Sequence, residues 1–166
     1  MFTSIKTSRS NKYIVTDLSR KFNLGAENII ARIALTYSLS KDRLLSLTDI
    51  SDSQGKEYSK NVLFGSNLPY YVGLICVKYG LYKTDKDIPK YIKMHIDDGL
   101  QLMNNELRDN PNLNGYDYLI DKIETGKTRR MTQSQLGRLC GMSKSQISRM
   151  ENGTLGSPET ISRVLN

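Results

Sequence analysis

Apolar residues recur every three to four positions along most of the chain, and this period is typical of amphipathic helices. The clearest run begins between Thr84 and Pro89. The apolar residues that share one of its faces are Ile92, Ile96, Leu100, Met103 and Leu107. This stripe predicts a long helix with one buried face, and it places Lys90, Lys93 and Asp97 in solvent.

Three more helices are predicted before this one, so we expect a mostly all-α fold with a four-helix domain. The first helix runs to Asn23 from about Ser8, whose hydroxyl can accept hydrogen bonds from the unpaired amides of a first turn. The other two cover residues 26–39 and 66–80. The later one has a proline near its start and a glycine at its end, which is the usual asymmetry of helix ends.

Two stretches between or before these helices lack the helical period. Residues 2–7 mix Thr, Ile and Ser, and this composition predicts a short N-terminal strand. Residues 48–60 are polar and contain Gly55, so we expect an exposed loop there.

The helix at residues 26–39 carries apolar residues on most of its circumference, and such a helix needs cover on several sides. Gly25 and Ala26 at its start are small enough to let another backbone approach closely. Two interpretations stay open. Either Gly25, Ala26, Ile30 and Ile33 form a subunit interface, or the helix lies in the interior of one domain.

The stretch from Met131 to Gly153 predicts a helix-turn-helix. Thr132 and Ser143 can each cap a helix, and Gly137 makes sense in a helix interior mainly where a second helix passes very close. The apolar or small residues where the two helices would touch are Leu136, Gly137, Cys140, Met142, Ile147 and Met150. The alternative is an ordinary helical hairpin with a polar face.

Polar side chains occupy the rest of this motif. In a helix-turn-helix the second helix lies in the DNA major groove, where its outer face presents donors and acceptors to base edges, while residues near helix ends contact phosphates. The candidate DNA-binding residues are Gln133, Ser143, Lys144, Ser145, Ser148, Arg149 and Asn152.

The string TQSQLGRLCGMSKSQISRMENG resembles the Xre/Cro family of phage-repressor-like domains, which have a Gln-led first helix and a Ser-x-x-Glu-Asn-Gly end to the second. The resemblance covers about residues 116–166. It implies a small DNA-binding domain whose first helix is supplied by residues 116–125.

Length and composition narrow the class of protein. A chain of 166 residues with 38% hydrophobic content suits one domain, or one domain with a small appendage. No apolar run approaches the ~20 residues of a membrane span, and the N-terminus lacks the apolar core of a signal peptide, so we expect a cytoplasmic protein without membrane contact. Cys76 and Cys140 each lie in an apolar helical pattern, which favours buried thiols over a disulfide or metal site.

The formal charge of +7 is unevenly distributed. Residues 1–43 hold eight basic and three acidic residues, residues 44–109 eight and nine, and residues 110–166 eight and five, which gives +5, −1 and +3. Two basic regions around a neutral middle favour contact with a polyanion at two places, although a solvated basic surface is the alternative. The candidate DNA-binding residues of the first region are Lys6, Arg9, Lys12 and Lys21.

The sequence lacks the residue combinations on which most enzyme mechanisms depend. His95 is the single histidine, and it is more simply interpreted as a helix-surface or packing residue than as an acid or base. Asp97 and Asp98 are adjacent on a helix, about 100° apart, so they do not face one site. No cysteine, histidine and carboxylate cluster has metal-ligand spacing, and GKT at residues 126–128 lacks the glycine and strand of a phosphate-binding loop. We therefore expect no enzyme activity, metal or cofactor.

Four further strings, in order along the chain, resemble the DndE family. They are NLGAENIIARIA at residues 23–34, DSQGKEY at 52–58, VLFG at 62–65 and DIPKYIKMHIDDGL at 87–100. That family belongs to the bacterial system that replaces a non-bridging oxygen of the DNA backbone with sulfur. The resemblance implies a small, mostly helical, oligomeric protein that binds duplex DNA, nicked DNA in particular, without evident catalytic residues.

Together these patterns predict a DndE-like DNA-binding and oligomerisation domain at residues 1–109, a linker at 110–115 and a helix-turn-helix domain at 116–166. The expected function is a non-catalytic DNA-binding subunit of a phosphorothioation system. The helix-turn-helix would add sequence readout, and the expected partners are duplex DNA, other proteins of the system and further copies of the chain, such as a tetramer. The alternative is a transcriptional regulator of the modification or restriction genes.

Overall fold

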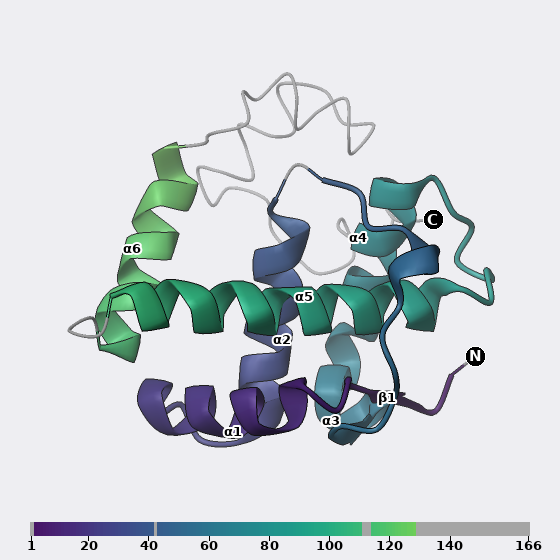
Figure 1. Cartoon of the computed structure of the whole chain (residues 1–166). Helices are drawn as coiled ribbons and strands as arrows, with labels where there is room; N and C mark the ends of the chain where they lie inside the picture. The colour runs from purple at the N-terminus through teal and green to yellow at the C-terminus, as the bar shows by residue number, and fades with distance from the viewer. Residues whose placement is uncertain (1, 42, 111–113, 129–166) are drawn as a thin grey trace. The chain divides into compact units, whose positions relative to one another are not determined.

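The long helix predicted in the middle of the chain, α5, is the element against which the others pack (Figure 1). The computed structural model describes residues 2–41, 43–110 and 114–128. Its elements are β1 (Ser4–Lys6), α1 (Asn11–Phe22), α2 (Glu27–Leu39), the 3₁₀ turn η1 (Leu47–Asp49), β2 (Glu57–Ser59), α3 (Lys60–Phe64), the 3₁₀ turn η2 (Gly65–Asn67), α4 (Leu68–Tyr79), α5 (Ile88–Asp109) and α6 (Gly115–Thr128). The mostly all-α prediction, with a short N-terminal strand, is confirmed.

The buried face of α5 follows the predicted stripe. Ile92, Ile96, Leu100 and Met103 are all 0% exposed. Lys93 and Asp97, however, were expected in solvent, and here the prediction is wrong, because their side chains are only 7% and 10% exposed. The start of α1 and η1 cover that side of α5 as well. The two side chains form an ion pair one turn apart, at 2.7 Å, so neither charge is buried alone.

α2 crosses behind α5 in Figure 1, and this crossing is the most extensive helix contact of the fold. Gly99 of α5 lies directly against the backbone of Ala34 of α2. A Cβ atom on Gly99 would sit 1.9 Å from the Ala34 carbonyl oxygen. Glycine is therefore required at this position by space, and it lets two helix backbones pass at a distance that no side chain permits.

Within a single chain α2 already has cover on several sides, from α1, α3 and α5. Ile30 is 0% exposed and Ile33 is partly buried, whereas Gly25 and Ala26 at the start of the helix are exposed. The interior-helix interpretation accounts for Ile30. The proposed interface role of these four residues stays a prediction.

β1 and β2 form an antiparallel ribbon in which Ile5 lies opposite Tyr58. The predicted N-terminal strand is confirmed. The expectation that residues 48–60 form only a loop is wrong, since β2 lies at the end of that stretch and η1 at its start. The pattern hid β2 because it is three residues long with a single buried side chain, Tyr58, and its partner lies about fifty positions earlier.

The first turn of α6 packs onto the same helices. Tyr118 is 2% exposed, its ring meets Phe22 edge-on at 5.6 Å, and its hydroxyl donates to a carboxylate oxygen of Glu106 at 2.9 Å. The chain divides into two compact units, residues 1–119 and 120–166. The predicted boundaries at 109 and 116 stay a prediction, and α6 begins at Gly115, inside the predicted linker.

Candidate nucleic-acid interface

The outward face of α1 gathers basic side chains on one side of the first unit. α1 buries Val15, Leu18 and Phe22 against the core, so the residues between them point away from it. The exposed residues on and just before this helix include Arg9, Lys12, Tyr13, Asp17, Arg20 and Lys21. A helix that combines a buried apolar stripe with a basic outer face can lie along a polyanion.

The four basic residues predicted for this region differ in whether they form ion pairs with nearby carboxylates. Arg9 and Lys12 are exposed and form no ion pair within the described part of the chain. Lys6 is 3.1 Å from Glu57, and Lys21 is 3.0 Å from Asp17. All four of these paired side chains are about half exposed, so water and counterions screen both pairs, and each lysine can exchange its carboxylate for a phosphate at small cost.

Two residues of this face were missed from the sequence, Arg20 and Tyr13. Arg20 is exposed, and the described residues give it no acidic partner within ion-pair distance. It lies eight positions after Lys12, on the same helical face and about 12 Å along the axis. Tyr13 is 78% exposed beside Lys12. The helical spacing between Lys12 and Arg20 was the signal that could have added Arg20.

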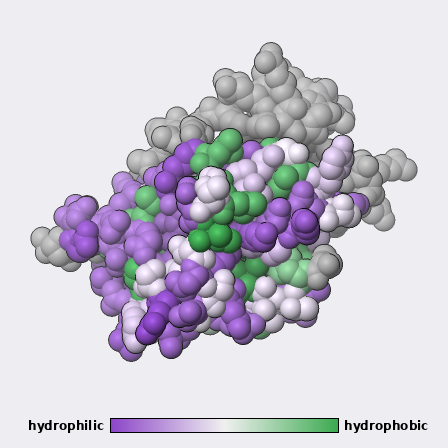
Figure 2. All heavy atoms as spheres, turned by 45° about the vertical axis from the view of Figure 1, so that its right-hand side comes forward, coloured by the Kyte–Doolittle hydropathy of each residue, from purple (hydrophilic) through white to green (hydrophobic). Residues whose placement is uncertain are grey.

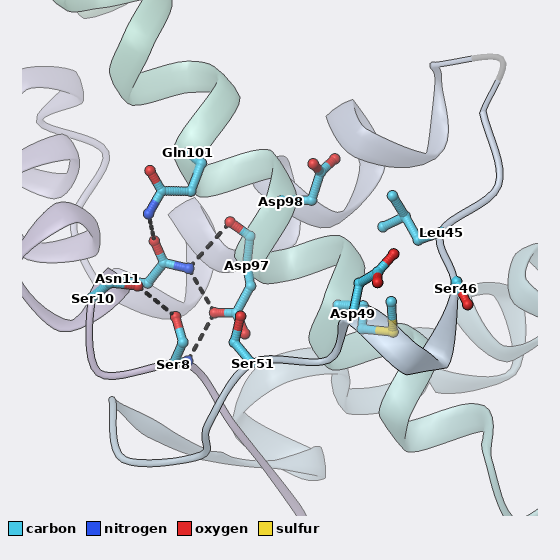
Figure 3. Close-up of a pocket in the computed structure, with 11 residues that line it drawn as sticks. Ser8, Ser10, Asn11, Leu45, Ser46, Asp49, Ser51, Asp97, Asp98 and Gln101 are labelled. Atoms are coloured by element: carbon cyan, nitrogen blue, oxygen red, sulfur yellow. Dashed lines mark hydrogen bonds between the residues drawn. The ribbon is translucent and has the colours of Figure 1, made fainter.

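A buried hydrogen-bond network fixes the start of α1 on α5, and with it the direction of Arg9 and Lys12. Asp97 accepts from the Ser8 amide at 2.8 Å and from the Asn11 side chain at 2.7 Å, both through Oδ1 (Figure 3). Its other oxygen accepts from Lys93 at 2.7 Å. The Gln101 side-chain amide donates to Oδ1 of Asn11 at 2.7 Å, which holds the Asn11 side-chain amide in place.

The predicted capping role of Ser8 is wrong. α1 begins at Asn11, and its N-cap is Ser10, which makes no capping bond through its side chain. The Ser8 hydroxyl lies 3.0 Å from that of Ser10, and the Ser8 amide is held by Asp97. The residue still marks the start of the helix, but it does so by joining the chain to α5 rather than by accepting from first-turn amides.

Carboxylates flank the basic face and remain ionised. Asp52 accepts from the Arg9 backbone amide at 2.9 Å, and hydrogen bonds from the Arg9 and Gln54 amides hold the pKa of Asp52 below its usual range. The Ser4 hydroxyl and the Lys6 ammonium group likewise lower the pKa of Glu57. The face is therefore mixed near β1 and most positive along Lys12 and Arg20.

A polar pocket of about 260 Å³ adjoins this network on the α5 side. Its lining includes Asp49, Asp97 and Asp98, several serines, Met94 and Leu45, and no lysine or arginine (Figure 3). Asp97 bonds toward Ser8 and Asn11, whereas Asp98 accepts from Ser38 and Arg43, so the two carboxylates serve separate networks. Without a cation in its wall the pocket is unsuited to phosphate.

His95 is a packing residue, and it is 0% exposed. Its Nδ1 atom is 2.7 Å from the Ser38 hydroxyl, and its Nε2 atom is 2.8 Å from the Tyr79 hydroxyl. Tyr79 also accepts from the Leu45 amide at 3.0 Å, so the histidine ties α2, α4 and the segment after α2 to α5. Ser38 is 1% exposed, which leaves a substrate no access to the Ser38–His95 pair.

We expect this histidine to make the fold acid-sensitive. Burial, with a further contribution from nearby Lys78, lowers the pKa of His95 from 6.5 to about 4. Between pH 6.5 and pH 4 the imidazole is therefore protonated in the unfolded chain but neutral in the folded chain. The contribution of His95 to the free energy of unfolding is fully present above pH 6.5, and roughly 3 kcal/mol of it is lost as the pH falls toward 4. Urea unfolding at a series of pH values measures the loss. His95→Gln, although less stable at pH 7, should lack this part of the pH dependence, and an equal slope in both proteins would contradict the assignment.

Several predicted residues cannot be placed. Gln133, Ser143, Lys144, Ser145, Ser148, Arg149 and Asn152 lie outside the described residues, and so does Cys140. Cys76 is a partly buried free thiol. Over the described ranges, no group of three histidine, cysteine or carboxylate side chains is placed to hold a metal ion, and no helix is long and apolar enough to cross a membrane.

The helical unit resembles a solved structure. The crystal structure of DndE from Escherichia coli B7A, described as involved in DNA phosphorothioation modification, matches with a TM-score of 0.51 and 19% sequence identity. The match covers 62% of this chain and 98% of that one, so at this identity it shows a shared fold. No protein of curated function matches the sequence.

Two family models match the sequence in separate parts. Residues 127–166 match a helix-turn-helix domain, which confirms the motif predicted there. Residues 4–110 match the family described as DNA sulphur modification protein DndE, and this range includes β1, all of α1 to α5 and the basic face of α1. Because that match covers more than half of the sequence, the chain belongs to the DndE family.

Proposed function

We propose that this protein is a non-catalytic DNA-binding subunit of a bacterial DNA phosphorothioation system. Its first compact unit, residues 1–119 and called the DndE unit below, would hold duplex DNA through the outward face of α1. Family membership and the helix-turn-helix match support a role on DNA. The observation that carries the choice of surface is the set of exposed cations that have no ion-pair partner among the described residues, Arg9 just before α1 and Lys12 and Arg20 on it.

The dimensions of this face suit a phosphate backbone. Lys12 and Arg20 are about 12 Å apart along α1, and one DNA strand places three to four phosphates over that length when it is measured along the duplex axis, at about 3.4 Å each. Tyr13 stands exposed between basic neighbours, and a tyrosine hydroxyl is a common donor to phosphate oxygens. Contacts of this kind position a protein on DNA without reading its sequence.

Sequence readout belongs, in this proposal, to the helix-turn-helix, with Lys144, Ser145, Ser148 and Arg149 at base edges and Gln133, Ser143 and Asn152 near phosphates. The chain would act as a homo-oligomer on intact or nicked duplex, beside other proteins of the system that carry the sulfur chemistry. Gathering copies matters, because a single helix-turn-helix rarely discriminates well, whereas two recognition helices about 34 Å apart match one turn of DNA.

We expect a division of labour between the two parts. Replacing Lys12 and Arg20 together by alanine should weaken binding by similar factors on a selected site and on scrambled duplex, and should lower the slope of log affinity against log salt by roughly 2. Arg149→Ala should cost about 1–3 kcal/mol on the selected site and little on the scrambled one. Titrations of both duplexes at several salt concentrations measure these effects.

The matched control is Lys90→Ala, since Lys90 is also exposed but lies on α5 in an ion pair with Asp87. It should leave affinity unchanged. Lys21→Ala should have a smaller effect than Lys12→Ala, because Asp17 already neutralises Lys21 in part. A total salt slope below about 2 for the unaltered protein, or equal losses from Lys90→Ala and Lys12→Ala, would contradict a backbone interface on α1.

The helix-turn-helix match favours a second candidate function, a transcriptional regulator of the modification or restriction genes. The phenotype of cells that lack this protein distinguishes the subunit role from the regulator role. Loss of phosphorothioate linkages, measured by mass spectrometry of genomic DNA, supports the subunit role. Retained linkages with altered transcript levels support the regulator.

A further inference from the structure

α4 is apolar on both sides, although only one side is covered. Its inner side carries Leu68 at 9% and Ile75 at 0% exposure. On its outer side Tyr70, Leu74 and Val77 remain 56%, 50% and 64% exposed. These three residues are spaced i, i+4 and i+7, which places them in one stripe along the helix. A helix that is apolar all round is ordinarily buried all round.

The outer stripe has the composition of a helix–helix contact. Gly73 lies within it, and a Cβ atom built on Gly73 would meet nothing within 4 Å, so the space above it is open. No position of the stripe carries a charge, and on α3, which packs against α4, Val62 is 57% exposed. Figure 2 brings the α4 side of the molecule forward and shows hydrophobic atoms gathered near the middle, with hydrophilic atoms around them.

We propose that a second copy of this chain covers the outer face of α4, defined by Val62, Tyr70, Gly73, Leu74 and Val77. This inference rests on the proposed self-association and names its surface. α2, the other strongly apolar helix, is already covered by α1, α3 and α5 of its own chain. Among the described helices, α4 is the one whose stripe of large apolar side chains is left half exposed or more.

The area of this face agrees with what a dimer needs. At the exposures given above, its four large side chains offer on the order of 400 Å² of apolar surface, against ~800 Å² per partner in a standard interface of which a little over half is apolar. The absence of charge in the stripe also suits a two-fold contact, in which each residue meets the same patch on the partner and like charges would face each other.

Gly73 sets the geometry of the contact. With no side chain at the centre of the stripe, two α4 helices can cross there at close range, and Leu74 and Val77 of each copy then pack beside the crossing. Two residues at a two-fold axis face each other directly. Cysteines placed at position 73 would therefore lie within the 4.4–6.8 Å Cα separation that a disulfide spans.

Sedimentation velocity of the full chain at micromolar concentration tests the surface. The unaltered protein should sediment as an oligomer. Leu74→Asp and Val77→Asp should each raise the protein concentration needed for self-association at least tenfold. Leu74→Gln, a milder change, should do the same in part while keeping the helical circular dichroism unchanged. Tyr13→Asp is the matched control, since Tyr13 is 78% exposed on α1, and it should leave the oligomer intact.

Cross-linking gives an independent readout of the crossing point. In a chain with Cys76→Ser and Cys140→Ser, Gly73→Cys should form a disulfide-linked dimer under mild oxidation, whereas Thr84→Cys, exposed after the end of α4, should not. An unaltered chain that is monomeric at micromolar concentration overturns self-association altogether. An oligomer that survives both aspartate substitutions, or a Thr84→Cys chain that forms as much disulfide-linked dimer as Gly73→Cys, overturns only the choice of the α4 surface. Affinity for duplex DNA tests the DNA-binding role separately.

Discussion

Replacing Gly99 by alanine is expected to lower the free energy of unfolding of the DndE unit by about 4 kcal/mol or more. The added Cβ atom would lie 1.9 Å from the carbonyl oxygen of Ala34 and 2.5 Å from its carbonyl carbon. Both are backbone atoms of a buried helix, so neither can turn aside as a side chain would. α2 and α5 would have to separate along their main contact. Urea unfolding followed by circular dichroism measures the change.

Gly73→Ala, measured in the Leu74→Asp background that keeps copies apart, is the matched control, because it is the same substitution in another helix with open space above it within one chain. Alanine is the better helix former by about 1 kcal/mol, so this variant should be slightly stabilised. Similar losses from both substitutions would mean that the close approach of Gly99 to Ala34 does not govern stability.

Tyr118→Ala is expected to destabilise the same unit by about 3–5 kcal/mol, the usual cost of removing a large buried aromatic side chain. Its ring packs against Phe22 and Tyr37, and its hydroxyl donates to Glu106. Tyr118→Phe keeps the ring and removes the hydroxyl that bonds to the charged Glu106, so it should cost about 1.5–3 kcal/mol. Chemical unfolding of the full chain separates the two contributions.

The control for this series is Tyr82→Ala, since Tyr82 is 86% exposed and should change stability by less than about 0.5 kcal/mol. If Tyr118→Ala unfolds like the unaltered protein, the first turn of α6 adds nothing to the DndE unit. If Tyr118→Ala unfolds at lower denaturant concentration, a fragment that ends at residue 109 should be less stable than one that ends at 119, because the shorter fragment leaves Phe22 uncovered.

Elements whose period is set by burial on one face could be predicted from the sequence. The stripe of α5, from Ile92 to Leu107, is local information, because each residue repeats the environment of the one a turn earlier. The start and end of α4 were equally local, since Pro69 fixes a φ angle in its first turn and Gly80 adopts φ +65° after its last.

Features that depend on distant partners could not be predicted. Lys93 and Asp97 look like solvent residues, but Ser8 and Asn11, more than eighty positions away, and the segment at Ser51 bury them. β2 was missed for the same reason, because its pairing partner is β1. In the candidate interface, Arg9 and Lys12 were found from charge, while the lack of an acidic partner for Arg20 could be recognised only in three dimensions.

The ribbon of β1 and β2 has a consequence for the order in which the chain acquires structure during synthesis. Ser4 bonds to a residue 53 positions later, and the Ser8 amide bonds to one 89 positions later. At the ~5–20 residues per second of translation, β1 and the start of α1 are synthesised several seconds before either partner. The amino-terminal strand is therefore among the last parts to settle. Until then the basic start of α1 is displayed on an unanchored segment, and nascent chains should bind nucleic acid less selectively than the finished protein.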